Sequence, residues 1–183
     1  TARHQYRQHA VTGYYDLITW MPRELIFESA DALAQNNLLA NPYACHLGLS
    51  IKPDRKYEDT VKGLTDWLQR SIEAYRRYGA MAYSTCEECS IERTEGAWDN
   101  PEALKDYLAY LQERYGNVAN LNVIWGSAFK NFAEIGPVSF AEAKTSGQPT
   151  RWLEQELHKV ERFNRVYETL YGQIQKGDPG ARM

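Results

Sequence analysis

The sequence has almost no charge excess and no long apolar run. Lys and Arg number 21 against 24 Asp and Glu, a net charge of -3. A nucleic-acid-binding domain needs a basic excess to neutralise phosphates, so this balance argues against that class. No stretch approaches the roughly 20 apolar residues that a helix needs to cross a bilayer, so we expect no membrane partner. The 43% hydrophobic and 25% charged content is that of a globular domain and excludes a disordered chain.

Cysteine is also scarce. The chain has Cys45, Cys86 and Cys89, an odd number that is too small for a disulfide scaffold. These residues neither require nor exclude an oxidising compartment, so the sequence assigns no location in the cell.

Aromatic residues are abundant, with 5 Trp, 13 Tyr and 5 Phe, or 13% of the chain. Tyr and Trp rings combine a flat apolar face with a polar group, which suits a carbohydrate or another amphiphilic ligand. A Tyr-rich core explains the same composition equally well.

The periodicity of the chain predicts helices that alternate with short strands. Apolar residues at helical spacing indicate a helix up to Gly79, and residues 80–86 follow as an apolar run of strand length. A second helix is predicted to begin at Asn100 and Pro101, a cap residue and a favoured first-turn residue. It ends at Gly116, and a short helix is expected at residues 118–125. A long helix feeding a buried strand is typical of α/β folds.

A third long helix is predicted from residue 149 or 150 to residue 176. We expect His158 on its polar face. Its predicted inward residues are all apolar or aromatic: Leu153, Leu157, Val160, Tyr167, Leu170, Tyr171 and Ile174.

The best candidate for chemistry is the pair Glu87 and Glu88, at the carboxyl end of the predicted strand 80–86. Functional groups of α/β sheets sit on the loops that leave this edge. Adjacent carboxylates disfavour each other's ionisation, and partial burial would raise the pKa of one of them toward use as a general acid. Two solvated loop charges explain the same pair.

Three segments of the chain follow a known pattern in order and spacing. The first is residues 83–90 (YSTCEECS), and the second is residues 100–116, a predicted helix that ends in LQERYG. The third is residues 121–135, which contains LNVIWGSAF at 121–129 and FAEI at 132–135. This pattern resembles the β-galactosidase-like glycoside hydrolases of family 42 and their relatives, over about a third of the chain. In that family a helix ending in Leu-x-x-Arg-Tyr-Gly precedes Leu-Asn-x-x-Trp-Gly-x-x-Phe.

The resemblance implies a (β/α)8 TIM barrel and a retaining mechanism with two carboxylates. The catalytic acid/base of the family corresponds to Glu88, and Glu87 occupies the position that contacts sugar hydroxyls. The family has Asn or Asp there, and an ionised Glu cannot donate a hydrogen bond as Asn can. Trp125 and Tyr83 are further candidates for substrate binding, although packing explains both. A carbohydrate is the implied substrate, and no cofactor is implied.

The length of the chain bears on this interpretation, because a complete barrel has about 250 residues. We therefore expect residues 1–183 to be a single partial barrel domain, α/β in class, helix-rich, truncated at both ends and covering the middle strands. Nothing in the chain aligns with the nucleophile of the family, so the chain alone should be inactive. Uncovered packing surface predicts homo-oligomers or poor solubility.

Two other interpretations stay open. The first is a noncatalytic carbohydrate-binding or scaffold protein of barrel ancestry. The second is a small zinc-bearing domain, since residues 86–89 form Cys-x-x-Cys and Cys45 with His46 would complete a ligand set. The second Cys-x-x-Cys pair typical of such domains is absent, and two acidic residues between thiols raise the thiol pKa, which disfavours a redox role.

Overall fold

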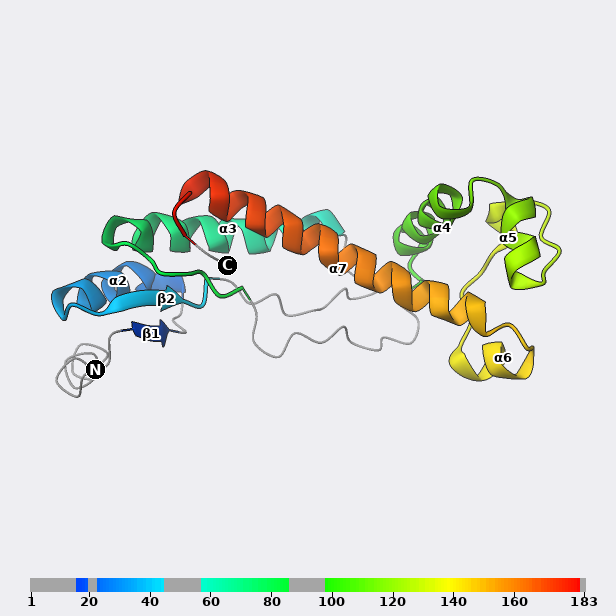
Figure 1. Cartoon of the computed structure of the whole chain (residues 1–183), viewed down its shortest axis with the longest axis horizontal. Coiled ribbons are helices and arrows are strands. Elements are labelled where there is room, and N and C mark those ends of the chain that lie inside the picture. The colour runs from blue at the N-terminus through cyan, green and yellow to red at the C-terminus, as the bar shows by residue number, and fades with distance from the viewer. Residues whose placement is uncertain (1–15, 20–22, 45–56, 86–97, 182–183) are drawn as a thin grey trace. The chain divides into compact units, whose positions relative to one another are not determined.

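The computed structural model describes residues 16–19, 23–44, 57–85 and 98–181 of the chain. These residues form mainly helices, with one small sheet (Figure 1). The chain divides into two compact units. The first comprises residues 1–48, 58–89 and 166–183, and the second comprises residues 49–57 and 90–165.

The first unit contains a two-stranded parallel sheet. Strands β1 (Asp16–Thr19) and β2 (Leu39–Pro42) pair in parallel along their whole length. Parallel neighbours need a crossover connection, which the 3-10 helix η1 (Arg23–Leu25) and helix α2 (Ile26–Gln35) supply. The chain continues through α3 (Tyr57–Tyr75) and the 3-10 helix η2 (Arg76–Tyr78).

One more parallel contact follows η2. Gly79 ends that helix in the left-handed region, with a φ of 72°, as predicted for a C-terminal cap. Ser84 then forms a parallel bridge with Tyr43, Ala82 is a bridge residue as well, and the Met81 amide donates to the Ala40 carbonyl at 2.9 Å. The predicted strand over residues 80–86 is thus reduced, among its described residues, to these bridges.

Helix α7 (Pro149–Gly177) contributes residues 166–177 to the first unit, where it contacts α3 through Gln173 with Gln69 and through Gly177 with Ile72. Leu170 and Ile174 are fully buried on α7, as Leu68 is on α3. A Cβ atom at residue 177 would lie only 2.8 Å from Cγ2 of Ile72, closer than real Cβ contacts. Glycine at this position therefore permits the end of α7 to approach α3.

The second unit consists of helices. It contains α4 (Pro101–Tyr115), α5 (Val118–Trp125), the 3-10 helix η3 (Phe132–Glu134), α6 (Phe140–Thr145) and residues 149–165 of α7. Figure 1 shows α5 beside the end of α4.

Local capping explains where these helices begin and end. The Asn100 side chain accepts a hydrogen bond from the Glu102 amide at 2.9 Å, and Pro101 occupies the first turn, which confirms the predicted start of α4. The predicted bounds of α5 and its end at Gly126 are also confirmed. Helix α6 was not predicted, although Ser139 and Glu142 form a reciprocal capping box at its start.

The core of the second unit is aromatic and helical. It consists of buried residues from α4, α5 and the segments beside them: Trp98, Tyr107, Leu111, Tyr115, Leu121, Trp125 and Ile135.

This core explains why the expected (β/α)8 barrel fragment is wrong. Among the described residues, strands occur only in the β1–β2 sheet, with bridge residues at Tyr43, Ala82 and Ser84. The apolar residues between 98 and 135 pack between helices instead of covering a sheet. A long helix that leads into an apolar run is therefore not sufficient evidence of a barrel.

The prediction for the inward face of α7 is also partly wrong. Leu170 and Ile174 are buried as expected, but Leu153 and Val160 are 49% and 41% exposed. Tyr167 and Tyr171 of α7 are exposed as well. His158, expected on the polar face, is fully buried. Polar residues of α7 take the buried positions in the second unit because α4 offers them hydrogen-bonding partners.

The close approach at Gly177 can be tested with a matched pair of glycine substitutions in α7. We expect Gly177→Ala to lower the free energy of unfolding by about 1–3 kcal/mol, because its methyl group would collide with Ile72. Gly172→Ala should be neutral or stabilising by up to about 1 kcal/mol, since nothing lies within 4 Å of its added Cβ. Urea unfolding of both variants measures this, and equal effects would contradict the contact.

Candidate functional site

Most residues of the predicted catalytic loop lie outside the described part of the chain. This applies to Glu87 and Glu88, and to the three possible metal ligands Cys45, Cys86 and Cys89. The described residues on either side of the loop are both buried, with Thr85 4% and Trp98 5% exposed.

Tyr83 and Trp125, the two predicted substrate-binding aromatics, lie in the interior. Tyr83 is fully buried, and its hydroxyl donates to Asp178 Oδ2 at 2.9 Å. Burial and this hydrogen bond raise the pKa of Tyr83 above its ordinary value. Trp125 is 4% exposed, and its Nε1 donates to Tyr115 Oη at 3.1 Å. Neither ring presents the open face that a stacked sugar needs, so in this structure both act in packing.

The Trp125 ring is held by edge contacts with two other rings. Tyr115 meets it at 85° with centroids 6.1 Å apart, and Phe129 meets it at 82° and 6.4 Å. Asn122, on the same helix, accepts hydrogen bonds from the Phe129 amide and from Ser127 Oγ, while its own amide donates to the Phe129 carbonyl. The turn after α5 is thereby fixed by side chains of α5 itself.

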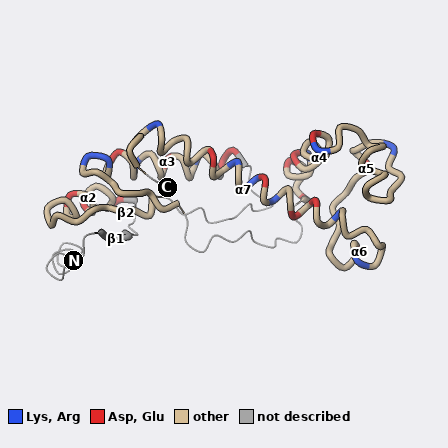
Figure 2. The backbone as a smooth tube through the Cα atoms, viewed as in Figure 1, with Lys and Arg blue, Asp and Glu red and all other residues tan. Residues whose placement is uncertain are grey.

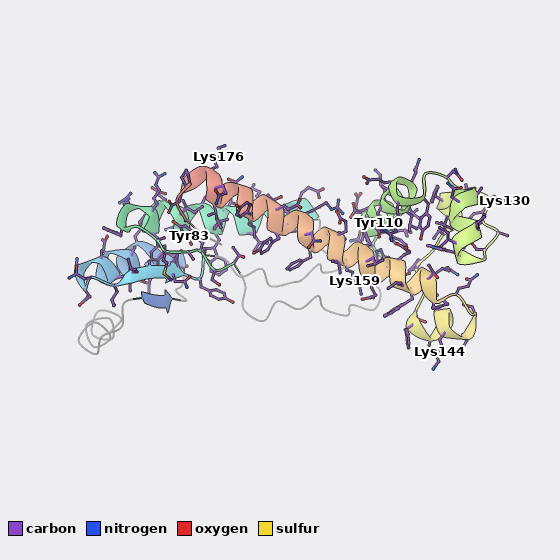
Figure 3. All side chains as sticks on the ribbon, in the orientation of Figure 1. Tyr83, Tyr110, Lys130, Lys144, Lys159 and Lys176 are labelled. Carbon is purple, nitrogen blue, oxygen red and sulfur yellow. The ribbon has the colours of Figure 1, made fainter. Side chains whose placement is uncertain are left out.

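A buried carboxylate, Glu154, joins α7 to α4. Its side chain is 4% exposed. Tyr115 donates to Oε1 at 2.7 Å, Tyr110 donates to Oε2 at 3.1 Å, and Arg114 Nε lies 3.1 Å from both oxygens. Figure 3 labels the Tyr110 side chain on α4. The buried charge is thus matched by a guanidinium and two hydroxyls, as buried carboxylates require. Burial, with the nearby Glu154 charge, raises the pKa of Tyr110 to about 12.

A second polar cluster surrounds His158, one turn further along α7. Trp98 Nε1 donates to His158 Nδ1 at 3.1 Å, and His158 Nε2 lies 3.1 Å from Asp106 Oδ2. Since Nδ1 accepts a hydrogen bond from Trp98, the neutral ring carries its hydrogen on Nε2, which donates a hydrogen bond to Asp106. Arg165 also binds Asp106, at 3.2 Å, and Arg162 Nε lies 3.4 Å from it.

The pKa values of Asp106 and His158 both lie below their ordinary values, for different reasons. Burial alone would raise the pKa of Asp106, but hydrogen bonds from His158 and Arg165 outweigh it and lower the value to about 2. Burial lowers the pKa of His158, and Asp106 opposes this effect only in part. At neutral pH the pair is therefore a neutral imidazole beside an ionised carboxylate.

The central side chains of the two clusters, Glu154 and His158, are closed to a ligand, whereas Asp106, Arg114 and Arg165 are partly exposed. Glu154 and His158 are buried, and the groups around them already use their hydrogen-bonding atoms. They can orient helices and hold charge in the interior, but a substrate cannot reach them in this structure.

A groove with a volume of about 530 Å³ runs between α4 and η3. Its walls are mostly apolar, with Leu104, Leu108 and Phe132, and its polar side chains are Lys105 and Gln112. A retaining hydrolase needs two carboxylates, and the described residues that line the groove include none.

No cluster of three or more His, Cys, Asp or Glu residues suited to a metal ion occurs within the described ranges. None of the helices in those ranges is both long and apolar enough to span a bilayer. Charges of both signs are spread along α4 and α7 (Figure 2).

Comparison with known proteins finds no matching family model, no similar curated protein and no similar solved structure. The resemblance to family 42 hydrolases thus stays a prediction from the residues.

The sequence did not point to the buried polar residues of α7. Glu154 and His158 lie four residues apart, a spacing that places two side chains on one helix face. The same spacing occurs on α4 at Asp106, Tyr110 and Arg114. These two matching faces are the sequence signal that indicates Glu154 and His158.

The role of Glu154 can be tested against its neighbour Glu156. Glu154→Gln should lower the free energy of unfolding by about 2–4 kcal/mol, because it leaves Arg114 without its carboxylate and weakens two buried hydrogen bonds. Glu156→Gln removes the ion pair with Lys159, in which the Glu156 side chain is 29% exposed. This change should lower the free energy of unfolding by less than about 1 kcal/mol. Urea unfolding measures both, and equal losses would contradict the difference in burial.

Asp106 gives a pH-dependent prediction. Its folded pKa of about 2 lies below the ordinary 3.8, so its stabilisation is present above pH 3.8 and is lost as the pH falls toward 2. We expect Asp106→Asn to lower stability at pH 7 by about 1–2 kcal/mol, after allowing for partial solvent screening.

The stability difference between Asp106→Asn and the unmodified protein should shrink between about pH 4 and pH 2. Thermal unfolding across this pH range measures it. Substitution of the exposed Asp99 by Asn is the control and should show no such trend. A deficit that stays constant down to pH 2 would contradict the ion pairs of Asp106.

Proposed function

We propose that the chain carries the acid/base carboxylate of a retaining glycoside hydrolase that acts on β-galactoside-like substrates. Glu88 is the acid/base, and Glu87 contacts the sugar hydroxyls. The proposal does not depend on a barrel fold, which the described residues do not form.

The observation that supports this proposal is the close packing of motif residues around Tyr115 and Trp125 in the second unit. Tyr115 and Trp125 share a hydrogen bond, while Gly116 and Gly126 end their helices with positive φ values of 72° and 63°. Leu121, between them, is fully buried. The motif residues between 115 and 126 thus have defined parts in the second unit, which supports the match in spacing over this part of the motif.

The chemistry follows from the two steps of a retaining mechanism. Glu88 donates a proton to the glycosidic oxygen while a second carboxylate bonds to the anomeric carbon, and the leaving group departs as an alcohol. Glu88 then takes a proton from water, which attacks the anomeric carbon and releases the second carboxylate. The proposal assigns the second carboxylate to no residue of this chain.

A comparison of Glu88→Gln with Glu87→Gln in the full-length protein tests the proposal. With phenyl β-galactoside, whose leaving group needs protonation, Glu88→Gln should lower kcat/KM by about 10²–10⁴-fold. With a dinitrophenyl galactoside the first step needs no acid, so azide should restore turnover of Glu88→Gln by replacing water and yield a β-galactosyl azide. Glu87→Gln should raise KM and show no azide effect.

Two results would contradict this assignment. An unchanged kcat/KM for Glu88→Gln with phenyl β-galactoside would exclude Glu88 as the acid/base. Sugar binding without hydrolysis by the unmodified protein would favour a noncatalytic carbohydrate-binding protein instead.

A further inference from the structure

The His158 side chain is fully enclosed, and both of its nitrogens have fixed partners. Nδ1 accepts from Trp98 and Nε2 donates to Asp106, each at 3.1 Å. The Tyr107 and Tyr110 rings of α4 lie against the imidazole, with centroids 5.3 and 5.2 Å away. The position of Trp98 therefore depends on a nitrogen that accepts only while the ring is neutral.

Protonation of the imidazole would reverse that contact. The new proton must go to Nδ1, since Nε2 already carries one. Two N–H groups would then face each other across 3.1 Å, and an imidazolium nitrogen has no lone pair to accept a hydrogen bond. A favourable hydrogen bond would become a repulsive contact.

The surrounding charges do not compensate for this. Asp106 of α4 faces the ring, but Arg162 and Arg165 of α7 already share its carboxylate. Lys159 Nζ lies 5.0 Å from the centroid of the Trp98 ring, and its charge is paired with Glu156 at 2.8 Å. A charged His158 would thus be a third cation, with Arg162 and Arg165, around the Asp106 carboxylate.

The remaining titratable neighbours do not change the balance. Glu154 lies one turn earlier on α7 and is engaged by Arg114 and the Tyr110 and Tyr115 hydroxyls. Asp99, beside Trp98, is exposed to solvent.

We propose that His158 is a pH-sensitive switch that holds Trp98 when neutral and releases it when protonated. Trp98 lies two residues before Asn100, the cap of α4. Its release loosens the start of α4 from α7 while the Glu154 cluster keeps the rest of α4 in place. The switch is independent of the proposed hydrolase activity.

The indole N–H signals of the 15N-tryptophan-labelled full chain test this proposal between pH 7.5 and 4.5. The Trp98 signal, assigned by its loss in Trp98→Phe, should move reversibly with an apparent pKa below the ordinary 6.5 of histidine. Trp125 is an internal control, because its N–H donates to the Tyr115 hydroxyl, which does not titrate in this range. Its signal should stay in place.

Two variants assign the titration to one histidine. In His158→Gln the Trp98 signal should not depend on pH over this range. Replacement of His4, His9 and His46 by Gln together should leave the titration unchanged. If His158→Gln fails to fold, the His158 ring-proton titration in the unmodified chain must follow the same curve as Trp98.

Three results would overturn the switch: a Trp98 signal that does not move, a Trp98 signal that moves only together with Trp125 as the unit unfolds, and a titration that persists in His158→Gln.

Discussion

The second unit depends on the carboxylate of Glu154. A charged group taken out of water must recover its lost hydration through hydrogen bonds and a counter-charge, and here both come from the last turns of α4. Tyr115, one of the donors to Glu154, also accepts from Trp125 and so connects α7 to α5. Through this chain of contacts, one buried charge orients three helices.

This constraint explains the faces that α7 presents. Because Glu154 and His158 must face α4 to meet their partners, Leu153 and Val160 turn outward. The two free-energy costs are unequal: an exposed leucine loses a modest gain from burial, whereas a buried carboxylate without partners is far more costly. Hydrophobic periodicity considers only the burial of apolar side chains, so its prediction for this part of α7 is wrong.

Sequence patterns were reliable where the structure is decided locally. Asn100 with Pro101, and the glycines at 116 and 126, predicted the ends of α4 and α5 because capping involves residues only a few positions apart. The barrel expectation failed because it depends on pairing between distant strands, which local patterns do not determine. The partner of His158 lies 52 residues away, and no local pattern indicates such a distance.

The fold of the second unit and the proposed chemistry are related through one motif. Its residues build the packing of α4 and α5, while Glu88 precedes them in the chain and carries the proposed reaction. A double-mutant cycle between Tyr115→Phe and Glu154→Gln, with urea unfolding as the readout, tests this packing most directly. The predicted coupling energy is about 1–3 kcal/mol, and a coupling near zero would contradict the central role of Glu154.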